Sequence, residues 1–101
     1  MEDILPTEFE LAQNYPYPFK ETTTIKYSVP IKSVVRIIVF NFDRKVVKKL
    51  VNKIQDAGRY EIQLDNSNLT EKDYYCEFKA YGLRFGSVKK INRTKKIILL
   101  K

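Results

Sequence analysis

Short runs of alternating apolar and polar residues, separated by turn-forming residues, constrain the fold of this chain most. Residues 22–29 (TTTIKYSV) place Ile25, Tyr27 and Val29 on one side of an extended segment and polar residues on the other. This pattern is typical of a half-buried strand, and Pro30 ends it because proline cannot donate to a strand ladder.

Further strands are predicted at residues 33–42, 59–65, 74–81 and 94–101. Residues 33–42 are an unbroken run of β-branched and aromatic residues, which predicts a central strand covered on both faces. Six or seven short strands with turn signals at short intervals predict an all-β fold. We therefore expect an antiparallel β-sandwich of about seven strands.

Residues 43–58 allow two interpretations. Their apolar residues have helical spacing, Asp43 could cap a helix and Gly58 could end it. The apolar positions are Val46, Val47, Leu50, Val51 and Ile54. A sandwich needs a strand here, and consecutive valines favour one. We therefore predict a strand and a loop over residues 45–57.

The alternating positions also predict which side chain of each strand faces a core. The predicted core residues are Ile25, Tyr27, Val35, Ile37, Val39, Ile62, Leu64, Tyr74, Cys76, Ile97 and Leu99.

The chain has a formal net charge of +7 and is basic without an acidic residue from Lys79 to Lys101. Such a tail can bind an anionic partner, but composition favours a solvated strand face instead. Residues 81–89 (YGLRFGSVK) faintly resemble an RNA-recognition strand, although that module also needs two helices. We interpret Tyr81-Gly82 and Phe85-Gly86 as a hairpin or bulge, and we do not expect nucleic acid as a partner.

The residue content gives catalysis little support. Histidine is absent and Cys76 is the single cysteine, so no intrachain disulfide can form, and Cys76 is predicted to be a small buried core residue. No enzyme activity, cofactor or metal site is expected. No segment is long and apolar enough to cross a membrane. The first residues (MEDILPTEF) do not resemble a secretory signal peptide, so a chain starting at Met1 would be expected in the cytoplasm.

Residues 13–19 (QNYPYPF) form a stiff extended segment, because each proline restricts its own φ and the residue before it. We expect this segment to lay Tyr15 and Phe19 over the open end of the sandwich. There it would protect a sheet edge from pairing with another chain.

This block begins a resemblance that extends over residues 5–101. The chain is similar to the C-terminal sorting domains of the type IX secretion system, which are related to the Ig-like domain of the flagellar hook-capping protein. The first two matching blocks are Gln13, Asn14, Tyr15, Pro16, Pro18, Phe19, and then Thr23, Thr24, Ile25, Tyr27, Pro30. The middle matches at Asn41, Leu50, Val51, Ala57, Gly58, Tyr60, Asp65, Leu69 and Tyr74, and the end at Thr94, Lys95, Lys96, Leu99, Leu100 and Lys101.

The chain also departs from the family pattern. Tyr17 replaces an asparagine, Leu64 replaces a tryptophan, and Arg44 stands where the family turns on glycine. Lys72 and Asp73 replace a Gly-Val pair. A left-handed turn on arginine or lysine costs about 1 kcal/mol relative to glycine, so we expect both turns to have changed conformation.

The resemblance implies a non-enzymatic sorting domain that directs an attached cargo through the type IX machinery to the cell surface or medium. Residues 1–10 would be a lead-in and residues 11–101 the domain. The implied partners are an N-terminal cargo, an outer-membrane translocon and a sortase-like protease, and we expect a monomer. The predicted recognition residues are Tyr15, Pro16, Pro18, Phe19, Lys95, Lys96 and Lys101. The alternative is a basic Ig-like module that binds anionic glycan or nucleic acid and is not itself secreted.

Overall fold

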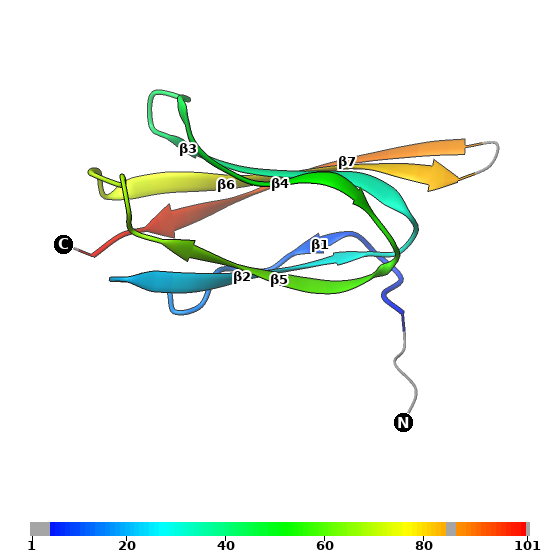
Figure 1. The fold of residues 1–101 in the computed structure, drawn as a ribbon, viewed down its shortest axis with the longest axis horizontal. Helices are drawn as coiled ribbons and strands as arrows, with labels where there is room; N and C mark the ends of the chain where they lie inside the picture. Colours follow the sequence, from blue (N-terminus) through cyan, green and yellow to red (C-terminus); the bar gives the residue numbers. More distant parts are fainter. Residues whose placement is uncertain (1–4, 85–86, 101) are drawn as a thin grey trace.

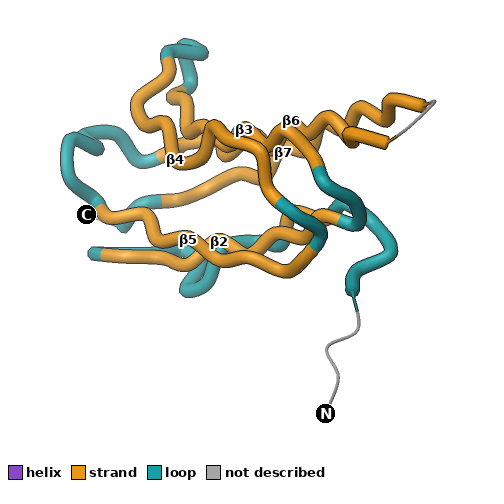
Figure 2. The backbone as a smooth tube through the Cα atoms, turned by 45° about the vertical axis from the view of Figure 1, so that its right-hand side comes forward, coloured by secondary structure: helices purple, strands orange, loops and turns teal. Residues whose placement is uncertain are grey.

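The structure, a computed structural model, describes residues 5–84 and 87–100 and consists of strands and connecting loops. The strands are β1 (Glu10–Leu11), β2 (Thr22–Val29), β3 (Ser33–Asn41), β4 (Val46–Gln55), β5 (Gly58–Asp65), β6 (Asp73–Arg84) and β7 (Ser87–Ile98). They form a three-stranded sheet in the order β1-β2-β5 and a four-stranded sheet in the order β4-β3-β6-β7. Figure 1 shows the sheets as two facing layers, and Figure 2 shows that strands make up most of both.

All strand pairs are antiparallel, so the predicted β-sandwich is confirmed. The strand order is that of an Ig-type arrangement in which the fourth strand has changed sheets. In a constant-type Ig domain the fourth strand pairs with the fifth, whereas here β4 pairs with β3.

The core lies between the sheets and includes buried side chains from every strand. The predicted core residues are buried, except that Ile62 is only partly buried against the cluster. Sequence periodicity missed Phe9, Leu11, Phe78 and Leu69. Phe9 packs its ring 6.5 Å from that of Phe78, so the predicted lead-in contains a core residue.

β3 differs from its prediction in an important way. It is central, with β4 on one side and β6 on the other. However, the β1-β2-β5 sheet covers only one of its faces, and Arg36 on the other face is exposed. The prediction that β3 is covered on both faces is therefore wrong for the isolated domain.

Residues 46–55 form a strand, so the choice of strand over helix is confirmed. A strand can accommodate apolar residues at helical spacing here because β4 shifts register against β3 at two points. These shifts leave Val47 and Leu50 without a partner. Each shift is a bulge that adds a residue and changes the face of those beyond it. Apolar residues that fill both faces of a bulged strand can therefore imitate a helix.

The prediction of a short C-terminal strand is wrong, because β7 begins at Ser87 and pairs with β6 over twelve residues. Gly82 lies inside this continuous ladder, paired with Ser33 and with Lys89. The predicted hairpin is confirmed, since β6 and β7 pair as far as Arg84 and Ser87, although Gly82 lies within the ladder and not at its turn. The predicted turn at Phe85-Gly86 lies outside the described residues.

The turn between β3 and β4 has kept its left-handed residue. Arg44 has a φ of 64°, so the expectation of a changed conformation is wrong there, whereas Lys72 has no positive φ. Asn41 stabilises the turn: its carbonyl oxygen accepts from the Arg44 amide at 2.9 Å, and its side-chain oxygen accepts from the Lys45 amide at 3.0 Å.

Side chains tie β4 to the other sheet at both of its ends. Tyr27 donates its hydroxyl to Gln55 at 2.7 Å, and Lys48 lies 3.0 Å from the Asp65 carboxylate. Hydrogen bonds from Ser67 and Lys48 lower the pKa of Asp65 to about 2. These contacts hold the edges of the two sheets together where no backbone ladder joins them.

Candidate functional site

The segment between β1 and β2 connects the two sheets. Tyr15 exchanges backbone hydrogen bonds of 2.9 Å with Thr24 on β2, in one sheet. Phe19 forms a parallel bridge with Leu99, just beyond β7 of the other sheet. The peptide bonds before Pro16 and Pro18 are both cis. The proline-rich block is therefore a strap across one end of the sandwich.

A small polar network fixes the start of this strap. The Asn14 amide donates to the Thr23 hydroxyl at 2.9 Å and to the Pro16 carbonyl at 3.2 Å. The Thr23 hydroxyl donates to the same carbonyl at 2.8 Å. Asn14 and Thr23 are both buried, so these bonds satisfy groups that water cannot reach.

The strap also holds the end of β7. The Phe19 amide donates to the Ile98 carbonyl at 3.0 Å, and the Leu100 amide donates to the Phe19 carbonyl at 2.7 Å. Gln13 adds a side-chain bond of 2.8 Å to the Lys96 carbonyl. The opening and closing segments of the chain, about eighty residues apart, therefore form one continuous surface.

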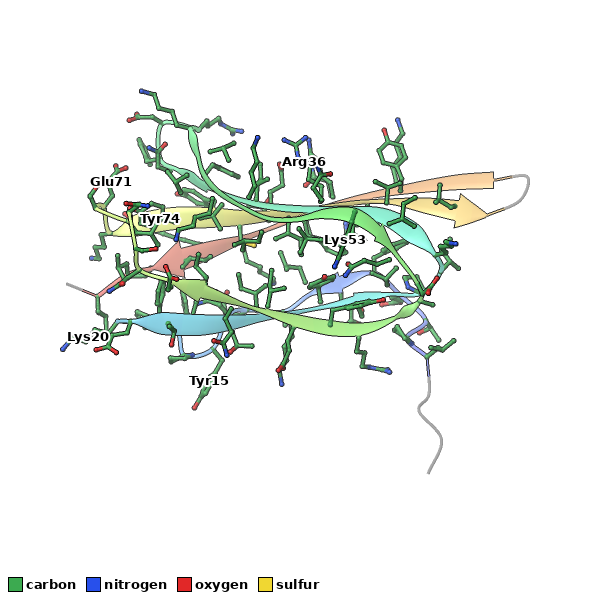
Figure 3. All side chains as sticks on the ribbon, viewed as in Figure 1. Tyr15, Lys20, Arg36, Lys53, Glu71 and Tyr74 are labelled. Atoms are coloured by element: carbon green, nitrogen blue, oxygen red, sulfur yellow. The ribbon has the colours of Figure 1, made fainter. Side chains whose placement is uncertain are left out.

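Two aromatic residues of the strap have opposite environments. Phe19 is 1% exposed and belongs to the core, whereas Tyr15 is 81% exposed. Figure 3 shows Tyr15 pointing away from the sandwich. The expectation that Tyr15 covers the open end is therefore wrong, and Phe19 alone does so. Pro16 and Pro18 are exposed beside Tyr15.

The predicted basic pair does not form one patch. Lys95 lies opposite Cys76, on the side of β7 that faces the core, and Lys96 lies opposite Tyr75 on the other side. Both lysines are exposed because β7 is an edge strand, and Lys96 lies 3.7 Å from Asp73. Lys101 lies outside the described residues.

No separate role was predicted for Gln13 and Asn14, although both belong to the matching block. Their neighbouring amides offered a signal, because a polar pair before a rigid proline segment can bond to backbone groups nearby. Their contacts show that they position the strap, with Asn14 holding it to β2 and Gln13 holding it to β7.

The described residues offer little for chemistry. Among them, no group of three or more metal-ligating side chains comes together. Burial raises the pKa of the Cys76 thiol to about 12, so this thiol stays protonated at neutral pH. Within residues 5–84 and 87–100, no helix has the length and apolarity needed to span a bilayer.

A comparison with known protein families matches residues 13–99 to the family described as secretion system C-terminal sorting domain. The chain belongs to this family. The sorting domain is a C-terminal sorting signal for type IX secretion, which implies a secreted or cell-surface cargo. The matched region begins with the strap and ends with its partner Leu99. Neither the curated proteins nor the solved structures gave a match.

Proposed function

We propose that the strap and the end of β7 together form the surface that the export machinery recognises. The observation that carries this proposal is the pairing of Phe19 with Leu99, which places the two ends of the family match side by side. Tyr15, Pro16 and Pro18 would present the exposed part of this surface, and Lys96 would contribute a charge. Phe19 would act indirectly, by holding the strap on the core.

The partners follow from the family. We propose that residues 11–101 sort a cargo attached through residues 1–10, and that an outer-membrane translocon receives the domain after its passage to the periplasm. A sortase-like protease would then remove the sorting domain from its cargo. The family is not known for catalysis, and we propose a non-enzymatic, monomeric domain. The comparisons give no support to the alternative of a basic glycan- or nucleic-acid-binding module.

The proposal is tested by fusing the domain to a reporter with a signal peptide in a type IX-competent host. The parent fusion should appear at the cell surface or in the medium, and deletion of residues 95–101 should prevent this. The deletion also removes Ile97 and Leu99 from the core, each contributing about 1.5–3 kcal/mol by burial. It therefore needs a variant that changes the surface alone.

Tyr15→Ala is that variant, because the side chain is exposed and its loss should change the free energy of unfolding by less than about 0.5 kcal/mol. Reduced export by a fully folded Tyr15→Ala domain would support recognition by the strap. Lys95→Gln with Lys96→Gln tests the charges in the same way. If both folded variants export as well as the parent does, the recognised surface lies elsewhere.

A further inference from the structure

The two sheets have very different outer faces. On the β1-β2-β5 sheet, the outward side chains of β2 and β5 pair as Thr22 with Asp65, Thr24 with Gln63, Lys26 with Glu61, and Ser28 with Arg59. This is the polar, charge-balanced face that an antiparallel sheet normally turns to water. No large exposed apolar side chain among the described residues lies on β2 or β5.

The outer face of the β4-β3-β6-β7 sheet, here called the uncovered face, carries apolar side chains on both sides of a central row in which Arg36 lies opposite Lys79. Ile38 is 7% exposed, yet it lies outside the core cluster, because its neighbours on this face cover it. Phe40 and Tyr75 stack with ring centroids 5.5 Å apart. The more exposed apolar side chains of this face are Val46, Ile54, Tyr81 and Leu83.

The sequence of β3 supports the same reading. Its outward residues include Val34, Ile38 and Phe40, so the strand has the composition of one that is buried on both faces. Only the core side is covered in the isolated domain. Apolar surface of this kind on a soluble domain marks a site of interaction.

Cations lie in the central row of the uncovered face and along its edge strands. The described cations of the uncovered face are Arg36, Lys49, Lys79, Lys90 and Lys96. Its described carboxylates are Glu77, 3.7 Å from Lys79, and Asp73, 3.7 Å from Lys96. The face therefore carries excess positive charge. Lys90 also lies 5.1 Å from the centre of the Tyr81 ring, a cation–π arrangement that keeps both groups at the surface.

We propose that the uncovered face is a second docking surface, which binds a protein surface on the export machinery that carries both acidic and apolar side chains. The inference rests on the proposed sorting function and adds the face and the chemistry of the partner. Charge complementarity selects the partner, since the excess positive charge of this face matches an acidic surface. A second copy is disfavoured because two such faces would bring like charges together.

A lipid surface fits less well than a protein. Charged side chains of Arg36, Lys79 and Glu77 lie between the apolar side chains of this face, and a hydrocarbon interior would have to desolvate them. Flat, well-packed strand faces instead suit another folded protein. A groove of about 460 Å³ beside Lys26 and Glu61 lies on the polar sheet, where mixed charges select no partner.

The test uses the full chain in the same reporter fusion, with charge changed at two exposed cations of the uncovered face. Arg36→Glu with Lys79→Glu should lower the amount of exported reporter by about tenfold. Arg36→Gln with Lys79→Gln should give a smaller loss, because it removes attraction without adding repulsion. The matched control is Lys26→Glu with Lys53→Glu, which changes net charge equally and leaves the uncovered face intact. Figure 3 shows Arg36 and Lys53 on opposite sides of their sheet.

Ile54→Ser tests the apolar part, since Ile54 is 56% exposed and its loss should leave the domain folded. Each variant is first checked by urea unfolding, so that lost export cannot reflect lost structure. Export that falls for Ile54→Ser and for the charge reversal, but not for the control, supports the docking surface.

Several results would overturn the inference. If the parent exports and all folded variants export equally, the docking surface is wrong while the sorting function stands. If the parent fusion exports no reporter, the proposed sorting function and the docking surface are both wrong. An equal loss of exported reporter in the double glutamate variant and the double glutamine variant would exclude an acidic partner. A dimer that Ile54→Ser dissociates in sedimentation, or binding to vesicles of phosphatidylglycerol and phosphatidylcholine that Ile54→Ser abolishes, would assign the face to another occupant.

Discussion

At the scale of residues, the backbone conformation of a single residue can lower the free energy of unfolding. Arg44 adopts a φ of 64°, a conformation that glycine reaches freely and other residues reach at a cost of about 1 kcal/mol or more. The Asn41 hydrogen bonds around the turn offset this cost. Cys76 illustrates the opposite case, a reactive group that burial makes inert.

Arg44→Gly should raise the free energy of unfolding by about 0.5–1 kcal/mol, because it removes the left-handed strain and retains the turn. Urea unfolding measures the change. Arg44→Ala is the control, and it should not stabilise, since alanine has the same difficulty at positive φ. Equal stabilisation by both variants would mean that the arginine side chain, and not its backbone, was unfavourable.

The Cys76 thiol should make stability depend on alkaline pH. Its pKa is raised from 9.0 to about 12 in the folded state, so the unfolded chain loses the proton first. The stabilisation is complete below pH 9 and is lost as pH rises toward 12. The difference in unfolding free energy between the parent and Cys76→Ala should therefore shrink over this range. A difference independent of pH would show that the thiol is accessible to water.

At the scale of elements, the strap connects β2 of one sheet to the end of β7 of the other sheet. It is bonded to β2 through Tyr15 and to the end of β7 through Phe19. Its aromatic side chains have separate tasks, since Phe19 is in the core whereas Tyr15 and Tyr17 are exposed. The same short segment can therefore contribute to stability and to recognition through different residues.

Phe19→Ala should lower the free energy of unfolding by about 3–5 kcal/mol, as expected for a large aromatic side chain removed from a core. Tyr15→Ala should change it by less than about 0.5 kcal/mol. Thermal or urea unfolding of the two variants side by side gives the comparison. A small effect of Phe19→Ala would mean that the strap is only loosely attached to the sandwich in solution.

At the scale of the whole molecule, the core joins both sheets into one unit. Buried residues from all seven strands belong to a single cluster, and the strap and the Lys48–Asp65 pair connect opposite edges. No strand can therefore leave without exposing residues that another strand covers.

We expect a single cooperative unfolding transition. Far-UV circular dichroism follows the strands, and tyrosine fluorescence follows local packing, since the chain has seven tyrosines and no tryptophan. The two signals should give the same urea midpoint. Separate midpoints would show that the long β6–β7 hairpin unfolds independently of the sandwich.

The sequence by itself determined the fold class, because the period-two pattern of β2 and β5 can bury only one face of an antiparallel sheet. The order of the matching blocks also indicated the sorting family. Tertiary structure decided the rest. Helical spacing in β4 became a bulged strand because its partner β3 imposed the register. The basic pair split across β7 because neighbouring residues of a strand point to opposite faces. The pairing of the strap with Leu99 and the uncovered face of β3 both depend on which distant segments pack together. Local sequence patterns do not contain this information.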